Sequence, residues 1–212
     1  ESQLWDKAFT VYSDLVKLAL ANKDGTIDLY NSFLRQGITA LKLDKLPEAT
    51  QSLINATKMN SIAFEPNYYL GQTMSKLEQY DKAIPLFKKA LLAKPEASEI
   101  YMQLGLCYYK ARKYRDSLPC FKKALDEDPG NKEALFNMAD AMSNEGHPEK
   151  AIKVFMHLRA DPVYGPRSCL QAGQYHAKIS DSNSAIQDFE IGLKHESTPP
   201  EIKIELEYNL AR

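Results

Sequence analysis

The sequence repeats with a period of 34 residues, and this period constrains the fold more than any other feature. When the chain is written in rows of that length, side chains of the same size recur in five consecutive rows. Periods of this length are typical of solenoids, in which one supersecondary unit stacks on copies of itself. The bulky column reads Leu53, Phe87, Phe121, Phe155 and Phe189. Two columns of small residues read Gly37, Gly71, Gly105, Ala139 and Gly173, and Ala49, Ala83, Ser117, Ala151 and Ala185.

Each row predicts two helices joined by a polar turn. In the third row, Tyr101, Leu104 and Tyr108 follow helical spacing, and so do the apolar residues of 118–125. Residues 113–116 form the turn between them. A glycine within a helix costs about 1 kcal/mol relative to alanine. The column of glycines therefore predicts that another helix lies too close for a side chain, and that the bulky column fills the space beside it.

The second helices of the second and third rows are expected to begin near Asp81 and Asp116. Either carboxylate can accept a hydrogen bond from the first turn of its helix, as capping side chains do. Pro85 and Pro119 would then lie near the fourth helical residue, at the edge of the positions where a missing N–H is harmless. A slightly shifted helix start or a small kink is expected at both prolines.

These features resemble the tetratricopeptide repeat. That family repeats W-x2-L-G-x2-Y, then A-x3-F, then P, with the same period. The second and third rows match it most closely, and the resemblance covers roughly residues 30–199. The matching residues are Leu70, Gly71, Ala83, Phe87, Ala90 and Pro95, and then Tyr101, Leu104, Gly105, Tyr108, Ser117, Phe121, Ala124 and Pro129.

The resemblance implies an all-α fold, a right-handed α-solenoid of antiparallel helix pairs that forms the tetratricopeptide superhelix. Residues 1–29 would be an N-terminal capping helix or a degenerate repeat, with a break at 22–25. The natural chain is expected to continue beyond Arg212, because a first helix without its second leaves a repeat incomplete. The repeats occupy 30–63, 64–97, 98–131, 132–165 and 166–199, and 200–212 is the first helix of a truncated sixth.

No residue pattern indicates an active site, and the chain is not expected to be an enzyme. The histidines lack the spacing of a metal site, and no nucleophile motif or phosphate-binding glycine motif occurs. His176 occupies an aromatic column and is interpreted as a packed replacement. No catalytic residue, metal ligand or cofactor is therefore predicted. The four histidines are His147, His157, His176 and His195.

In the family that the chain resembles, the first helices of successive repeats line a concave groove that binds a partner. Rows 64–165 carry the most aromatic residues and are favoured as the site. Asn137, both donor and acceptor, is suited to hold a peptide backbone. The alternative that these side chains simply pack inside the superhelix stays open. The groove residues mapped in this way are Leu34, Ile38, Tyr68, Gln72, Met102, Leu106, Tyr109, Phe136, Asn137, Asp140, Leu170 and Gln174.

A second candidate is a basic ladder at the C-terminal ends of the first helices. Four lysines that occupy the same position in their rows could contact an acidic partner. A cation at a helix C-terminus also offsets the helix dipole by about 0.3–1 kcal/mol, and the two interpretations carry equal weight. The lysines are Lys42, Lys76, Lys110 and Lys178.

The amino-acid composition limits the classes of partner and the location that are expected for the chain. The chain has 27 Lys and Arg against 28 Asp and Glu, a net charge of −1, so nucleic acid is not expected as a partner. No apolar run approaches the roughly 20 residues that span a bilayer, so direct membrane insertion is not expected either. Three cysteines without a C-x-x-C pair favour a reducing, cytoplasmic location.

The sequence therefore predicts a protein-interaction scaffold. It would bind a partner helix or an extended peptide in the groove and help to assemble a larger complex. Two alternatives stay open: the regulatory or substrate-recruiting region of a longer enzyme, and a structural array that associates with itself.

Overall fold

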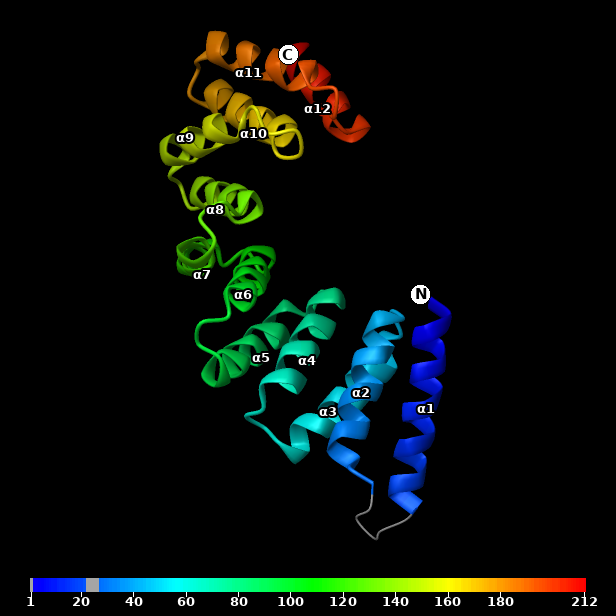
Figure 1. Cartoon of the computed structure of the whole chain (residues 1–212). Coiled ribbons are helices and arrows are strands. Elements are labelled where there is room, and N and C mark those ends of the chain that lie inside the picture. The colour runs from blue at the N-terminus through cyan, green and yellow to red at the C-terminus, as the bar shows by residue number, and fades with distance from the viewer. Residues whose placement is uncertain (1, 22–26) are drawn as a thin grey trace. The chain divides into compact units, whose positions relative to one another are not determined.

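The computed structural model describes residues 2–21 and 27–212, apart from the side chains of Ser2 and Ser98. Every element of this described part is an α-helix, which confirms the all-α prediction. The predicted break at 22–25 lies outside the described residues. The helices are α1 (Ser2–Ala21), α2 (Leu29–Lys42), α3 (Leu46–Met59), α4 (Phe64–Lys76), α5 (Tyr80–Ala93), α6 (Ser98–Lys110), α7 (Tyr114–Glu127), α8 (Lys132–Asn144), α9 (Pro148–Leu158), α10 (Gly165–Lys178), α11 (Ser182–Lys194) and α12 (Pro200–Leu210) (Figure 1).

The helices fall into two compact units, Glu1–Ala111 and Arg112–Arg212. Unit 1 contains α1 to α6, and unit 2 contains α7 to α12. The boundary lies within the third row of the sequence, in the turn between α6 and α7.

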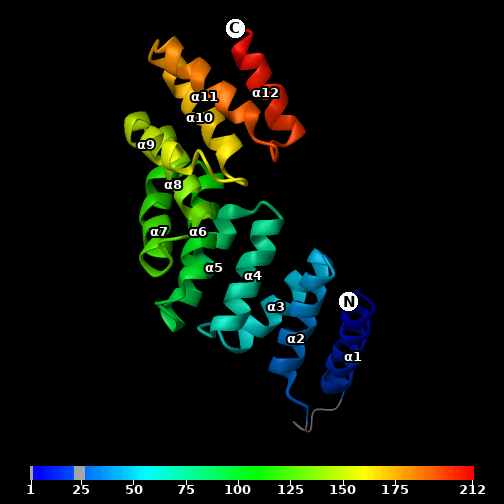
Figure 2. The ribbon, with the colours of Figure 1, turned by 45° about the horizontal axis from the view of Figure 1, so that its top comes forward.

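Within each unit, every helix packs on the next one along the chain. In unit 1, α2 also contacts α4, and α4 contacts α6. In unit 2, α10 contacts α12 beside α11 (Figure 2). Each row of the sequence from residue 30 to residue 199 holds two helices joined by a short turn, and the rows that lie within one unit form antiparallel pairs. The predicted class, a solenoid of antiparallel helix pairs, is therefore confirmed.

The bulky column of the repeat packs against its column of glycines. Phe87, Phe121 and Phe155 are fully buried. A Cβ atom at Gly71 would lie 2.9 Å from Cε1 of Phe87, which is closer than real Cβ contacts come. Gly37 faces Leu53 and Gly173 faces Phe189 in the same way. The predicted close approach of the paired helices is thus confirmed at these three repeats.

The turns inside the helix pairs share one backbone conformation. Each first helix is followed by a residue with a left-handed φ, between 57° and 95°, and these residues recur at the period of the repeat. In four of these turns the next residue donates its N–H to the carbonyl five positions back, as Lys45 does to Ala40 over 2.9 Å. This bond pattern is a Schellman motif, which ends one helix and reverses the chain within three residues. The left-handed residues are Asp44, Glu78, Arg112, Gly146 and Ser180.

The second helices begin earlier than predicted. α5 starts at Tyr80 and α7 at Tyr114, and neither has a side-chain cap. Asp81 and Asp116 lie inside the first turn of these helices, so the prediction that they cap them is wrong. The residue after the left-handed residue is the N-cap, as Asp181 is in the equivalent turn before α11, so α5 and α7 begin directly after the Schellman turn. Pro85 and Pro119 consequently lie inside their helices, further along than predicted.

Candidate functional site

A polar pocket lies among the first helices of unit 1. Its volume is about 290 Å³, and α2, α4 and α6 all contribute to it. It brings together three of the predicted residues, Gln72 of the groove and Lys42 and Lys76 of the basic ladder. Ser75 and Gln103 also line it, and Leu41 supplies an apolar wall.

The polar groups of this pocket are only loosely engaged. Nζ of Lys76 lies 2.8 Å from Oδ1 of Asp44, but both side chains are more than half exposed. Exposed pairs of this kind contribute about 0–1 kcal/mol, so a ligand carboxylate can replace Asp44 at little cost. Beneath the pocket, the Cys107 thiol donates to Oγ of Ser75 at 3.6 Å, and burial raises the pKa of Cys107. That cysteine is therefore a protonated structural group.

A larger pocket, of about 610 Å³, lies among α10, α11 and α12 in unit 2. It brings together two predicted residues, Gln174 and Lys178. Gln174 follows Gln72 by three repeats, and Lys178 follows Lys42 by four, so the same columns line both pockets. The remaining lining residues are Ala177, Ser182, Ala185, Ile186, Phe189, Asn209, Leu210 and Arg212.

The other ladder position, Lys110, ends α6 and is exposed, but it lines neither pocket. Nζ of Lys178 lies 4.9 Å from the centroid of the Tyr175 ring, a distance at which a cation is attracted to an aromatic face. Lys178 is thus held near the pocket by an aromatic neighbour on its own helix.

The mapped groove residues outside the two pockets divide into two groups by exposure. Leu34, Ile38, Met102 and Leu170 are less than 9% exposed and present little surface to a ligand. Leu106, Tyr109, Asn137 and Asp140 are half-buried. Nδ2 of Asn137 donates to the carbonyl of Glu133 at 2.9 Å, so part of its hydrogen-bonding capacity is used within its own helix.

Tyr68 and Phe136, two of the aromatic residues of the mapped groove, are half-buried and join the packing of their units. The Tyr68 ring stacks on Phe64, with centroids 5.6 Å apart, and burial raises the pKa of Tyr68 to about 12. The Phe136 ring lies 5.5 Å from Phe155 and 5.9 Å from Tyr164. Both rings therefore stabilise their units as well as contributing surface.

Sequence reasoning missed a buried ionic cluster in unit 2. Asp188 of α11 is 1% exposed and accepts hydrogen bonds from Arg159, at the end of α9, and from His176 of α10. Nδ1 of His176 lies 2.7 Å from Oδ2 of Asp188. The interpretation of His176 as a packed replacement for an aromatic residue therefore missed its hydrogen bond to Asp188. The signal that the sequence offered for this cluster was an acidic residue, Asp188, directly before Phe189 of the bulky column.

This cluster does not form a catalytic arrangement. Cys169, the nearby thiol, is buried, and burial raises its pKa to about 11, so it stays protonated rather than acting as a nucleophile. Nε2 of His195 is bound to the carbonyl of Arg159 at 2.8 Å. In the part of the chain that the structure describes, no group of three or more His, Cys, Asp or Glu side chains could hold a metal ion. The cluster ties three helices together.

Helices that pair in chain order and repeat at a fixed period define a helical-repeat protein. Family models of the tetratricopeptide repeat match residues 70–114, 98–131 and 120–153. Residues 70–153 of the chain are therefore tetratricopeptide repeats, as the sequence columns predicted.

Solved structures share the fold. The crystal structure of YrrB, described as a TPR protein with an unusual peptide-binding site, has a TM-score of 0.74 at 20% identity, covering 92% of this chain and 97% of YrrB. MamA from residue 41 to its end, from Desulfovibrio magneticus RS-1, has a TM-score of 0.73 at 19% identity, covering 81% of this chain and 97% of MamA. No curated protein matches the chain significantly in sequence. Among the described residues, no helix is both long enough and apolar enough to cross a membrane.

Proposed function

We propose that this protein is an interaction scaffold that binds an extended peptide, or a helix of a partner protein, along its first helices, and so helps to assemble a larger complex. The observation that carries the proposal is the recurrence of one set of columns. Glutamine and lysine at equivalent repeat positions line a pocket in unit 1 and a pocket in unit 2.

The chemistry of the pockets favours an extended peptide that carries acidic side chains. The amides of Gln72 and Gln174 can each donate to a backbone carbonyl and accept from a backbone N–H. Lys42, Lys76 and Lys178 are the lysines beside them, and each is exposed. The pocket residues include no carboxylate, so an acidic ligand meets no like charge among them.

The two interpretations of the lysine column are compatible. A lysine at the end of a first helix offsets the helix dipole whether or not a ligand is bound. Its ammonium group keeps further donors for a ligand carboxylate, since Lys offers three. The peptide-binding site named for YrrB is a property of that protein. It supports the proposal because it is an example of this fold binding a peptide.

Site-specific photocrosslinking tests the proposal. Peptides are first selected from a displayed library on the wild-type protein, and each is then incubated with chains that carry p-benzoylphenylalanine at one position. Gln72 and Gln174 should each crosslink to the selected peptides. Leu92, an exposed residue of α5 in neither pocket, is the control. Crosslinking at Leu92 alone would contradict the proposal.

A further inference from the structure

The first helix has two distinct faces. Its inner face packs on α2, where Nε2 of Gln36 donates to Oγ of Ser13 at 3.0 Å and Val16 is buried. On its other side, Leu4, Val11 and Leu18 are 70%, 56% and 48% exposed. These three residues, the α1 stripe, are seven positions apart and therefore share one line along the helix. Residues seven apart stay on one line where two helices pack side by side, so the α1 stripe can supply one apolar position per heptad to such a contact.

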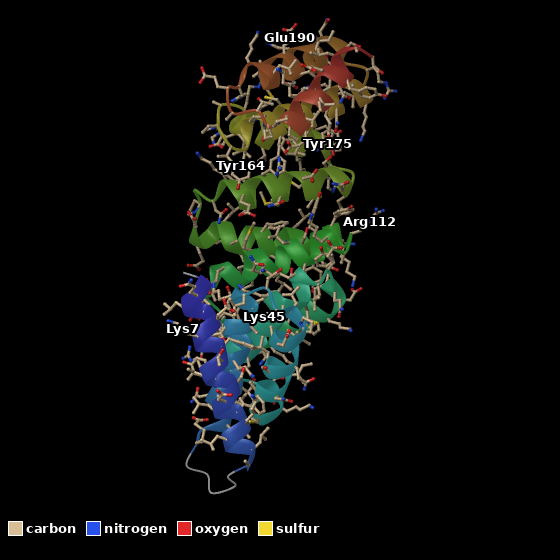
Figure 3. The ribbon with its side chains drawn as sticks, turned by 90° about the vertical axis from the view of Figure 1, so that its right-hand side faces the viewer. Lys7, Lys45, Arg112, Tyr164, Tyr175 and Glu190 are labelled. Carbon is tan, nitrogen blue, oxygen red and sulfur yellow. The ribbon has the colours of Figure 1, made fainter. Side chains whose placement is uncertain are left out.

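Charged residues run beside the α1 stripe at the same spacing. Lys7 and Asp14 each follow a stripe residue by three positions, so both lie on the same flank of it. Figure 3 shows Lys7 at the outer edge of α1. Asp14 pairs with Lys17 at 3.2 Å, but both side chains are more than 60% exposed, and such a pair is easily exchanged.

We infer that the α1 stripe is the contact between two copies of this chain, with the two α1 helices antiparallel about a two-fold axis at Val11. In that arrangement Leu4 of one copy faces Leu18 of the other. Lys7 then lies within about 1.5 Å, along the helix axis, of the level of Asp14 in the second copy. The two-fold axis makes this charge pair twice.

Charge selects this arrangement over a parallel one. Two parallel helices in register would place Lys7 of one copy about 10 Å along the helix axis from Asp14 of the other, so no pair of opposite charges would form. The antiparallel arrangement also closes, because one surface meets itself and no open face is left to bind a third copy. The contact lies on α1, away from the pocket residues of α2, α4 and α6, so the inference does not depend on peptide binding.

An introduced cysteine tests the geometry directly. The native cysteines, Cys107, Cys120 and Cys169, are all buried, so Val11→Cys would place one reactive thiol at the proposed two-fold axis. Under a copper–phenanthroline oxidant, which removes two electrons and two protons from the thiol pair, most of this variant should become a disulfide-linked dimer. Thr10→Cys, exposed on α1 but about 100° around the helix, is the control and should crosslink far less. Equal crosslinking of both variants would overturn the inference.

Light scattering after gel filtration gives the second test. The wild-type chain should approach twice its 24.0 kDa mass as concentration rises. Lys7→Asp and Asp14→Lys should each weaken self-association by about tenfold, because each creates like-charge contacts across the axis. The double exchange should restore it, and circular dichroism should show all three variants folded. A wild-type monomer at every concentration, or a double variant as weak as the single ones, would overturn the inference.

Discussion

The backbone N–H of Lys45 donates to the carbonyl oxygen of Ala40 over 2.9 Å, across the left-handed residue Asp44. The same bond joins Gln79 to Met74, across Glu78. A left-handed φ strains any residue with a Cβ, by roughly 1 kcal/mol or more, whereas glycine adopts it freely. The repeat therefore carries an avoidable strain at each turn whose left-handed residue is not glycine.

Replacing this residue should change stability with opposite signs at two turns. Glu78→Gly should raise the free energy of unfolding by about 0.5–1 kcal/mol, because it relieves the strained φ. Gly146→Ala should lower it by about 1 kcal/mol, because alanine resists the φ of 95° there although the space around Gly146 is open. Urea denaturation measures both, and a loss of stability in Glu78→Gly would show that the turn is held by something other than this motif.

The contact between Gly71 and Phe87 is open to a double-mutant cycle. Gly71→Ala should destabilise the protein by about 1–3 kcal/mol, since the new methyl group meets the Phe87 ring in a packed core. Phe87→Ala should cost about 3–5 kcal/mol, because the ring is fully buried. In the Phe87→Ala background the methyl group has room, so the second change should cost little. If the two losses are additive, the cost of Gly71→Ala does not come from contact with the Phe87 ring.

Removing the Asp188 carboxylate should be costly for its size. Asp188→Ala leaves the guanidinium of Arg159 and the ring of His176 without their shared acceptor, and we expect a loss of about 3 kcal/mol of unfolding free energy. Glu190→Ala changes an exposed carboxylate on the same helix and should cost less than about 0.5 kcal/mol. If thermal denaturation finds the two variants equal, the buried cluster contributes no net stability.

Asp161 should make stability depend on acid. Its carboxylate accepts from Nζ of Lys132 at 2.6 Å and from the backbone N–H groups of Tyr164 and Val163, and these bonds lower its pKa from 3.8 to about 2. Because the folded pKa is depressed, the stabilisation is complete above about pH 4 and is lost as the pH falls through 2.

Asp161→Asn separates this contribution from the rest of acid unfolding. Between about pH 5 and about pH 2.5 the unfolding free energy of the variant should fall by about 1 kcal/mol less than that of the wild type. Asp116→Asn, on an exposed acid of α7, is the matched control. If the pH profiles of the wild type and Asp161→Asn are parallel, Asp161 does not contribute to the acid dependence of stability.

The features that sequence reasoning found are those set by local size and spacing. The helix pairs follow from periodicity, and the contact of Gly71 with Phe87 follows from the alternation of small and bulky columns. The turn column was not recognised because five different kinds of residue carry one backbone conformation, and only Gly146 shows the usual signature. The starts of α5 and α7 were misplaced for the same reason.

The features that the sequence did not reveal depend on packing between residues that are far apart in the chain. Arg159 lies 29 residues before Asp188, and nothing local marks them as partners. In the mapped groove, sequence could not separate a buried residue such as Leu34 from a pocket residue such as Gln72, because both fall on the same helix face of their repeats. Which of them reaches a surface depends on how closely the neighbouring helices pack.

Calorimetric titration of a selected peptide into two charge-reversed variants tests the central claim, that side chains of the first helices bind the partner. Lys42→Glu with Lys76→Glu reverses the unit 1 pocket, and Lys82→Glu with Lys89→Glu makes the same change in charge on the second helix α5. We expect a peptide that crosslinks at Gln72 to bind the first variant at least about tenfold more weakly and the second within about twofold of wild type. Equal weakening by both variants, or none by the first, would contradict this claim.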